Sequence, residues 1–148
     1  MYNILFLFFL FFLKASIADD KLFKIDYVDL KAYKLTKEIE GNKVRGKDIF
    51  VSRKVNCLSC HQAPLKEEKF HGNFGPSLVG VGDKYSRDQL RLIIINSKII
   101  NPTTIMPAYY KNIIYPRTPK EHLNKTILSF QEVEDVLEYI YTFKEDAK

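Results

Sequence analysis

A Cys-Leu-Ser-Cys-His pentapeptide occupies residues 57–61, and it limits what this chain can fold into more than any other feature. Two thiols three residues apart can add to the two vinyl groups of one haem, while the imidazole that follows binds the iron from one side of the ring. The chain has 2 cysteines in all, and both fall in this motif. We therefore predict one covalently bound haem c, attached through Cys57 and Cys60, with His61 as an axial ligand of the iron.

Two other uses of a Cys-x-x-Cys pair are open to the sequence. The pair can be a redox dithiol of the thioredoxin kind, or it can supply half of a zinc site. A redox dithiol is expected beside a strand-helix-strand pattern, and no such pattern flanks these cysteines. A zinc ion would need two further ligands, and His71 is not at the spacing found in zinc fingers.

The leading segment has the pattern of a signal peptide over residues 1–18. Residues 4–13 are an unbroken run of Ile, Leu and Phe that is too short to span a bilayer, and Ser16 and Ala18 supply the small side chains of a cleavage site. We predict cleavage after Ala18 and export to the periplasm. An uncleaved anchor is the alternative, because residues 1–3 lack the usual Lys or Arg. Export agrees with the pentapeptide, since c-type haem is attached outside the cytoplasm.

The chain that follows the leader has the size of one domain, about 130 residues. Residues 19–40 are polar and aromatic without clear periodicity, so we predict an extended N-terminal arm that carries no site. Residues 41–148 form the predicted domain. The net charge of +5 is scattered along the chain, which argues against a nucleic-acid-binding arm, while a mildly basic surface suits an acidic redox partner.

The first helix of the domain is predicted between Asn42, its N-cap, and Val55. Ile49 and Phe50 would lie on its inward face. Gly46, inside this helix, costs about 1 kcal/mol relative to alanine, which suggests that another element approaches it closely.

Two more helices are predicted to begin at capping boxes, at residues 86–89 and 129–132. The first continues with a buried face of Leu90, Ile93, Ile94 and Ser97 and ends at residues 101–102. The second is the clearest of the chain, and its apolar side chains at helical spacing are Val133, Val136, Leu137, Ile140 and Tyr141. Residues 62–82 and 103–125 are rich in Gly or Pro and are predicted loops, and no run has the alternation of a good strand. We predict an all-α fold with a few helices and long loops around the prosthetic group.

Met106 is the leading candidate for the second axial ligand of the iron. Once Met1 leaves with the leader, it is the one methionine that remains. It lies in a Pro-rich loop, whereas methionines that only fill a core usually lie on the apolar face of a helix. His71, among glycines, and His122, in polar surroundings, are the competing donors. A Met/His pair fills both axial positions and raises the reduction potential, so the iron would exchange electrons rather than bind a substrate.

Several longer strings resemble the SoxX monohaem cytochromes of bacterial sulfur oxidation. They are FHGNFGPSLVGVG at residues 70–82, NPTTIMPAYY at residues 101–110 and QEVEDV at residues 131–136, together with Tyr85-Ser86. The similarity extends from about Gly41 to Lys144. It implies a class I cytochrome c-like fold, with a monohaem cytochrome c domain over residues 41–148.

The resemblance also implies roles for particular residues. Cys57 and Cys60 would carry the thioether links, with His61 proximal and Met106 distal to the haem. The carbonyl of Pro76 would accept a hydrogen bond from the outer nitrogen of His61, and Pro76 and Leu78 would line the haem pocket. Gly46 and Phe50 match first-helix positions that cross the last helix in cytochromes c, and Tyr139 matches the aromatic residue on the other side.

The family role implied for this chain is that of an electron-accepting subunit. In this family the cytochrome pairs with SoxA, a haem protein with a cysteine-ligated iron, and the complex joins thiosulfate oxidatively to a cysteine of the carrier SoxY. The implied partners are a SoxA-like dihaem subunit in a heterodimer and a small cytochrome c that accepts the electrons. No nucleic acid, and no membrane once the leader is cleaved, is expected as a partner.

Because the haem would consume both cysteines, the chain would not be an enzyme alone. It would be the non-catalytic subunit of an L-cysteine S-thiosulfotransferase complex. One alternative is a freestanding periplasmic cytochrome c that carries electrons without a permanent partner. Another is a haem sensor or ligand-binding module, which would require an open sixth position on the iron.

Overall fold

The computed structural model describes residues 22–114 and 116–145. The predicted signal peptide over residues 1–18, with its cleavage site after Ala18, lies outside the described residues. Among the described residues, no helix is both long enough and apolar enough to cross a bilayer. The elements, in chain order, are β1 (Phe23–Asp26), β2 (Lys31–Lys34), α1 (Lys43–Val51), η2 (Cys57–Ser59), α2 (Val81–Lys84), α3 (Arg87–Asn96), η3 (Ser97–Ile99), η4 (Lys120–His122) and α4 (Phe130–Ile140).

The predicted starts of the three main helices are confirmed. The side chain of Asn42 accepts hydrogen bonds from two backbone N–H groups in the first turn of α1. Complete capping boxes begin α3, at Ser86 and Gln89, and α4, at Ser129 and Glu132. The predicted ends were too late, because α1 stops at Val51 and α3 gives way to the 3₁₀ turn η3 after residue 96. Capping signals mark where a helix begins more sharply than where it ends.

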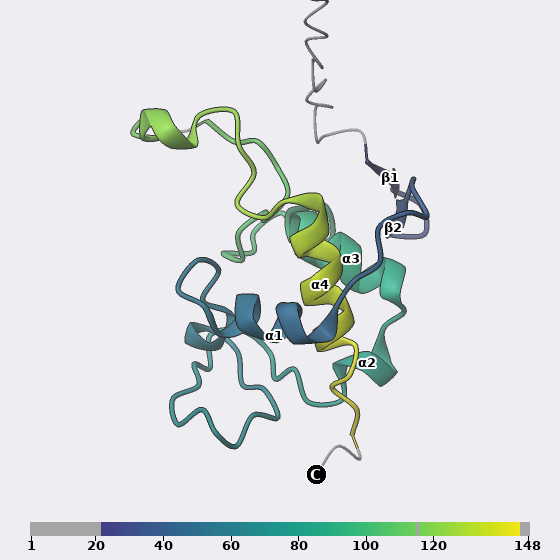
Figure 1. Ribbon diagram of the computed structural model, residues 1–148, viewed down its shortest axis with the longest axis vertical. Coiled ribbons are helices and arrows are strands. Elements are labelled where there is room, and N and C mark those ends of the chain that lie inside the picture. The colour runs from purple at the N-terminus through teal and green to yellow at the C-terminus, as the bar shows by residue number, and fades with distance from the viewer. Residues whose placement is uncertain (1–21, 115, 146–148) are drawn as a thin grey trace, which may run out of the picture.

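Helices α1 and α4 cross at Gly46, as the glycine inside the first helix predicted. A Cβ built at Gly46 would lie 1.9 Å from the carbonyl oxygen of Asp135 and 2.8 Å from the Cβ of Tyr139. Beside this contact, the rings of Phe50 and Tyr139 pack edge to face, with their centroids 5.5 Å apart. Figure 1 shows α1 crossing α4 at the centre of the molecule. A side chain at residue 46 would keep the two helices apart.

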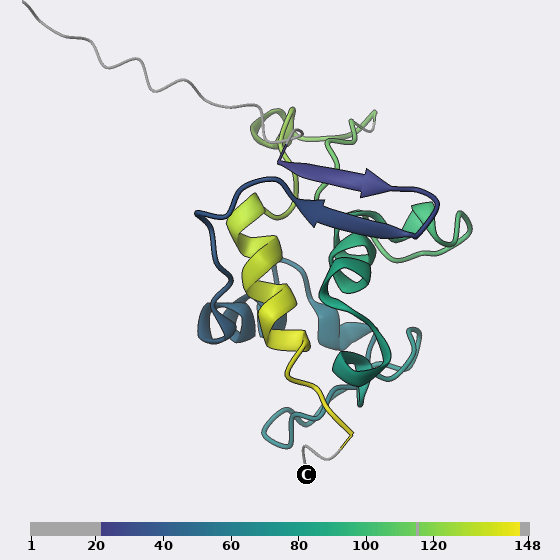
Figure 2. The ribbon, with the colours of Figure 1, turned by 90° about the vertical axis from the view of Figure 1, so that its right-hand side faces the viewer.

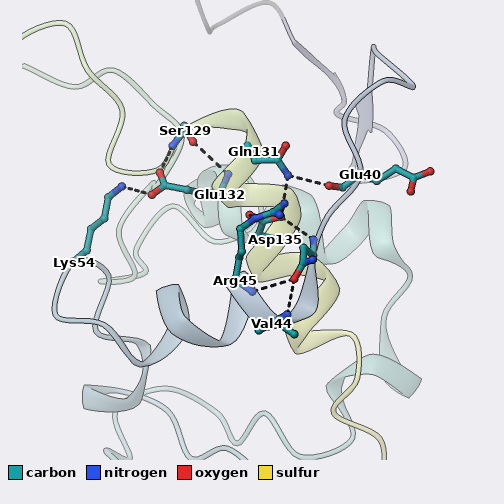
Figure 3. A network of polar contacts seen from close by, with 9 residues as sticks. Glu40, Val44, Arg45, Lys54, Ser129, Gln131, Glu132 and Asp135 are labelled. Atoms are coloured by element: carbon teal, nitrogen blue, oxygen red, sulfur yellow. Dashed lines mark hydrogen bonds and ion pairs between the residues drawn. The ribbon is translucent and has the colours of Figure 1, made fainter.

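A polar network ties the N-terminal end of α1 to the same helix. The Asp135 carboxylate accepts two hydrogen bonds from the Arg45 guanidinium, at 2.7 and 2.8 Å, and one from the backbone N–H of Asn42 at 2.7 Å. The side-chain amide of Gln131 donates to Asp135 and to the carbonyl of Glu40, both at 2.9 Å. Figure 3 shows how these side chains converge on the first half of α4.

The N-terminal segment corrects the prediction of an all-α fold. Residues 22–35 form an antiparallel hairpin, in which Phe23 pairs with Lys34 and Asp26 with Lys31, rather than an extended arm. The Asp26 carboxylate accepts hydrogen bonds from the N–H groups of Val28 and Asp29 and so stabilises the turn. Strands this short are stable when they pack against another element of the fold. The sequence pattern of this segment did not reveal that packing.

The hairpin covers the ends of α3 and α4, as Figure 2 shows from the side. The ring of Phe23 packs against Phe130 and Tyr110, with centroid distances of 4.5 and 4.9 Å. Ala32, on the second strand, is fully buried. The hairpin is therefore part of the folded domain, and the predicted boundary at residue 41 does not separate it from the core.

A buried ion pair joins α3 to α4 beneath the hairpin. Arg91 is 5% exposed and Glu134 is 2% exposed, and their side chains are linked by hydrogen bonds of 2.6 and 3.1 Å. Arg91 also donates to Asp88 and, at 2.8 Å, to the carbonyl of Ala32. Burial alone would lower the pKa of Arg91, but the hydrogen bonds and the Glu134 charge outweigh it and raise that pKa. The predicted buried face of α3 was incomplete, because it lacked Arg91, Leu92 and Ile95 and included the half-buried Ile93.

Candidate haem site

The pentapeptide forms one tight turn that gathers its three functional side chains. Cys57 begins the 3₁₀ turn η2, and its carbonyl accepts hydrogen bonds from the N–H groups of Cys60 and His61, at 3.2 and 3.0 Å. Leu58 is buried in the core, whereas both cysteines are half-buried. The thiols are free rather than joined as a disulfide. The backbone therefore holds two thiols and one imidazole on a single short segment.

The surroundings of these cysteines suit neither a redox dithiol nor a zinc site. Burial raises the pKa of the Cys57 thiol to about 12, so the group stays protonated, whereas a redox dithiol needs a lowered pKa. The strands of the described residues are the two strands of the hairpin at residues 23–34, so no strand-helix-strand pattern flanks the cysteines in this part of the chain. Among the described residues, no group of three or more His, Cys, Asp or Glu side chains could hold a metal ion.

The imidazole of His61 is oriented by a hydrogen bond that leaves its far nitrogen free. Its Nδ1 lies 2.8 Å from the carbonyl oxygen of Pro76, and because a carbonyl can only accept, Nδ1 carries the proton. The Nε2 atom then has a free lone pair, the form in which histidine binds a metal ion. Gly75 forms a wall beside the ring, where an added Cβ would lie only 2.3 Å from His61 Cε1.

The Gly- and Pro-containing loop after the pentapeptide wraps around it. The N–H groups of Gly72 and Gly75 donate to the carbonyls of Leu58 and Cys60, both at 2.7 Å, and Leu78 N–H donates to Gln62 at 2.8 Å. Leu78 is half-buried and packs against the core, while Pro76 is exposed apart from its bond to His61. The structure thus brings the predicted pocket residues Pro76 and Leu78 into the segment that surrounds His61.

Met106 comes from a separate loop that leaves the end of α3. Its side chain is half-buried and packs against the core. Its N–H donates to Thr104 Oγ1 at 3.2 Å, and its carbonyl accepts from Ser97 Oγ at 3.4 Å. The bond from Ser97 holds the backbone of the Met106 loop against η3, and the bond to Thr104 is local to the loop.

The two competing histidines have different surroundings. His71 accepts a hydrogen bond at Nδ1 from the N–H of Ala63, at 3.3 Å, and its buried Nε2 has no partner among the described residues. His122 is exposed at the end of η4, in a loop that projects from the helices in Figure 1. His71 therefore forms a hydrogen bond to the main chain, as is common for histidines in loops.

The family model for cytochrome c matches residues 44–144. This chain belongs to the cytochrome c family. A protein of this family carries covalently bound haem c, so the cofactor predicted from residues 57–61 is confirmed. The fold is accordingly the class I cytochrome c-like fold, and residues 22–114 and 116–145 contain four α-helices and a small two-stranded sheet.

One solved structure carries the comparison further. The chain is similar to a chain in the crystal structure of SoxXA from P. pantotrophus, with a TM-score of 0.70 and 32% sequence identity. The match covers 81% of this chain and 94% of that chain. It supports a cytochrome c of the SoxX type. The comparison with curated proteins gives no match.

The residues of this cytochrome fit a covalently held haem. Cys57 and Cys60 offer free thiols on one turn, and the hydrogen bond to Pro76 leaves Nε2 of His61 available. The space beside the ring is kept by a glycine whose Cβ would meet the imidazole. When bound, the haem supplies a metal centre that takes up and releases one electron at a time.

Sequence reasoning missed one residue that joins the two sides of the site. The hydroxyl of Tyr109 donates a hydrogen bond to the carbonyl of Val55, at 3.1 Å, in the buried interior. Tyr109 follows Met106 closely and Val55 precedes Cys57 closely. Tyr109 is part of the Met-Pro-Ala-Tyr-Tyr string at residues 106–110, but the sequence does not indicate which group its hydroxyl binds.

Proposed function

We propose that this cytochrome is the electron-accepting, SoxX-like subunit of a SoxAX complex. The observation that carries the proposal is the 32% identity to a chain of the SoxXA structure over 94% of that chain. A match that nearly spans the other chain concerns the whole fold rather than the haem motif alone. The proposal includes export to the periplasm by the leader at residues 1–18.

The reaction that the complex would serve releases two electrons. Thiosulfate and the thiol of a carrier cysteine form a sulfur–sulfur bond, and one proton and two electrons leave. With both cysteines of this chain joined to haem, it has no thiol left to hold a sulfur intermediate. Its share is therefore to receive the electrons one at a time and pass each to a small cytochrome c. The S-thiosulfotransferase chemistry itself would belong to the SoxA-like dihaem partner.

We assign both axial positions of the iron to side chains of this protein. His61 would bind through Nε2, held in place by its hydrogen bond to Pro76. Met106 would bind on the other side, from a loop whose backbone is fixed by Ser97 and Thr104. With both positions filled, the iron would exchange electrons without binding a substrate, and a Met/His pair would favour acceptance of electrons.

Co-expression with a dihaem SoxA-like protein tests the proposed subunit role. The two chains should co-purify as a heterodimer, and adding thiosulfate and the carrier protein should reduce the haem of this chain. A chain that stays monomeric, and that is not reduced by thiosulfate in the mixture, would support the freestanding periplasmic carrier instead.

The ligand assignment has an optical test that does not depend on any partner. Methionine sulfur bound to ferric haem gives a weak band at the red end of the visible spectrum. The oxidised protein should have this band, and Met106→Ala should remove it. Ile105→Ala, which changes an exposed neighbour, is the matched control and should retain the band. Persistence of the band in Met106→Ala would assign the position to another residue, and its absence in the parent would support an open, ligand-binding site.

A further inference from the structure

The Tyr109 hydroxyl connects the two chain segments that carry the proposed axial ligands. It donates to the Val55 carbonyl at 3.1 Å, and the two residues are 54 positions apart in the sequence. Tyr109 is 8% exposed and Val55 is 7% exposed, so water has little access to either group. Val55 lies just before the turn that holds the cysteines, and Tyr109 lies just after Met106. The bond therefore links the start of the segment that carries Cys57–His61 to the end of the segment that carries Met106.

The backbone of Tyr109 is held in place by two hydrogen bonds to neighbouring segments. Its N–H donates to the carbonyl of Ile94 in α3, at 3.3 Å, and its own carbonyl accepts from the N–H of Leu128 at 2.8 Å. Burial raises the pKa of Tyr109, so the hydroxyl keeps its proton and remains a donor throughout the ordinary pH range. The tyrosine thus spans from α3 to the segment before the pentapeptide.

We propose that Tyr109 is a positioning residue that clamps the Met106 loop against the Cys57–His61 segment. The clamp rests on the proposed ligation by Met106. In this proposal, release of Met106 from the iron displaces its loop from the core, and this movement pulls the hydroxyl from Val55. A buried carbonyl that loses its donor is costly, so the clamp opposes the opening.

The clamp can be tested by comparing the free energies of three states of the oxidised holoprotein: closed, open at Met106, and unfolded. If the bond breaks on opening, removing the hydroxyl destabilises the closed state relative to the open and unfolded states by the same amount. If the bond survives opening, removing it changes the unfolding equilibrium and leaves the opening equilibrium unchanged. The ratio of these two effects separates a clamp from a contact that only supports the fold.

Imidazole is a suitable probe, because it binds ferric haem after a weak axial ligand has moved away. Its apparent affinity is proportional to the population of the open state. Tyr109→Phe removes one hydroxyl and retains the ring. We expect it to raise the apparent imidazole affinity and the unfolding equilibrium constant by the same factor, roughly tenfold. Unfolding is followed by far-ultraviolet circular dichroism in denaturant without imidazole.

Tyr139→Phe is the matched control. Tyr139 is also a buried tyrosine, but it lies at the crossing of α1 and α4, and its hydroxyl has no partner among the described residues. The control should leave the imidazole affinity as in the parent. If Tyr109→Phe changes the unfolding equilibrium but not the imidazole affinity, or changes neither, the clamp is rejected while the ligand assignment stands. If the parent itself lacks the iron–sulfur band, the ligand assignment fails, and the clamp fails with it.

A measurement on the parent protein covers the case in which Tyr109→Phe does not mature. The Tyr109 hydroxyl proton is buried and bonded, so it should exchange slowly with solvent in nuclear magnetic resonance spectra. Saturating imidazole should speed this exchange by a factor that exceeds any change at amides within α4. Unchanged exchange of the hydroxyl proton in the imidazole-bound protein would overturn the clamp.

Discussion

Replacing Gly46 with alanine should destabilise the protein, although alanine is the better helix former. Helix propensity alone would favour alanine by about 1 kcal/mol in free energy. The new Cβ would lie 1.9 Å from the Asp135 carbonyl oxygen, and ordinary van der Waals contact begins at 3.4 Å. The two nearest obstructing atoms belong to the backbone of α4, and the third, the Cβ of Tyr139, is fixed to that backbone, so no side chain can rotate away to make room. The helices themselves must therefore move apart.

The size of the effect follows from what that movement disrupts. Overpacking a well-packed core costs about 1–3 kcal/mol. Separating α1 from α4 would also lengthen the hydrogen bonds of 2.7 and 2.8 Å between Arg45 and Asp135, and would loosen the packing of Phe50 on Tyr139. After the gain in helix propensity, we expect a net loss of about 2 kcal/mol in the free energy of unfolding. Such a loss is a large part of the stability of an ordinary domain.

Denaturant unfolding of the oxidised holoprotein, followed by circular dichroism, measures this loss. Asp48→Ala is the control, because residue 48 is exposed on the same helix and its replacement should change the free energy of unfolding by less than about 0.5 kcal/mol. The reasoning would be refuted if Gly46→Ala proved as stable as Asp48→Ala. That result would mean that α1 and α4 can separate at little cost.

Three further perturbations test other parts of the structure. Glu134→Gln should lower the free energy of unfolding by about 2 kcal/mol, because Arg91 loses its buried counter-charge and keeps only its pair with the more exposed Asp88; equal denaturation midpoints would contradict this. Burial alone would raise the pKa of Asp135, but the hydrogen bonds that it accepts hold its folded value below the unfolded 3.8. Its contribution to stability should therefore be complete above about pH 5 and be lost as the pH falls through the folded pKa. The gap in unfolding free energy between the parent and Asp135→Asn should shrink in acid, and a gap independent of pH would reject the assignment. Gly75→Ala would place a Cβ 2.3 Å from His61 Cε1, so the imidazole must turn and the reduction potential should shift; an unchanged potential in a redox titration would show that this wall does not hold the ring.

Sequence reasoning located the helix starts because each start is decided by neighbours within one turn. Asn42 bonds N–H groups two and three positions ahead, and the serines of the two capping boxes bond residues three positions ahead. Gly46 was also informative, because a glycine in a helix interior is costly and the close approach of α4 explains it. These signals are local, and local signals can be found without knowing the fold.

The hairpin and the buried ion pair could not be found in this way. The strands form where Phe23 packs on Phe130 and where the Ala32 carbonyl accepts from Arg91, which is 59 positions away. Similarly, Arg91 is a charged residue within the apolar run of α3, and its buried counter-charge, Glu134, lies 43 positions away in the sequence. A pattern of single residues does not contain such pairings, because each depends on which elements the fold brings together.

The candidate haem site also has features that local sequence signals predict and features that depend on long-range contacts. The pentapeptide predicts a turn that gathers two thiols and an imidazole, since all three lie within five residues of chain. The partner of His61 at Pro76 followed from the resemblance to the SoxX cytochromes, and the hydrogen bond is present in the structure. The link from Tyr109 to Val55 needed the three-dimensional arrangement. Ligation of an iron by Met106 stays a prediction.

Helix α4 sets the distance between the two segments that would face each other across the haem. The pentapeptide follows α1, whose position on α4 is fixed by the contact at Gly46 and by the bonds to Asp135 in Figure 3. The Met106 loop follows α3, which is fixed on α4 by the buried pair of Arg91 and Glu134. Each segment is therefore anchored on α4 through the helix that precedes it. The Tyr109 hydroxyl bond is a direct connection between the two segments, so it is the point where they can separate while both helices stay in place.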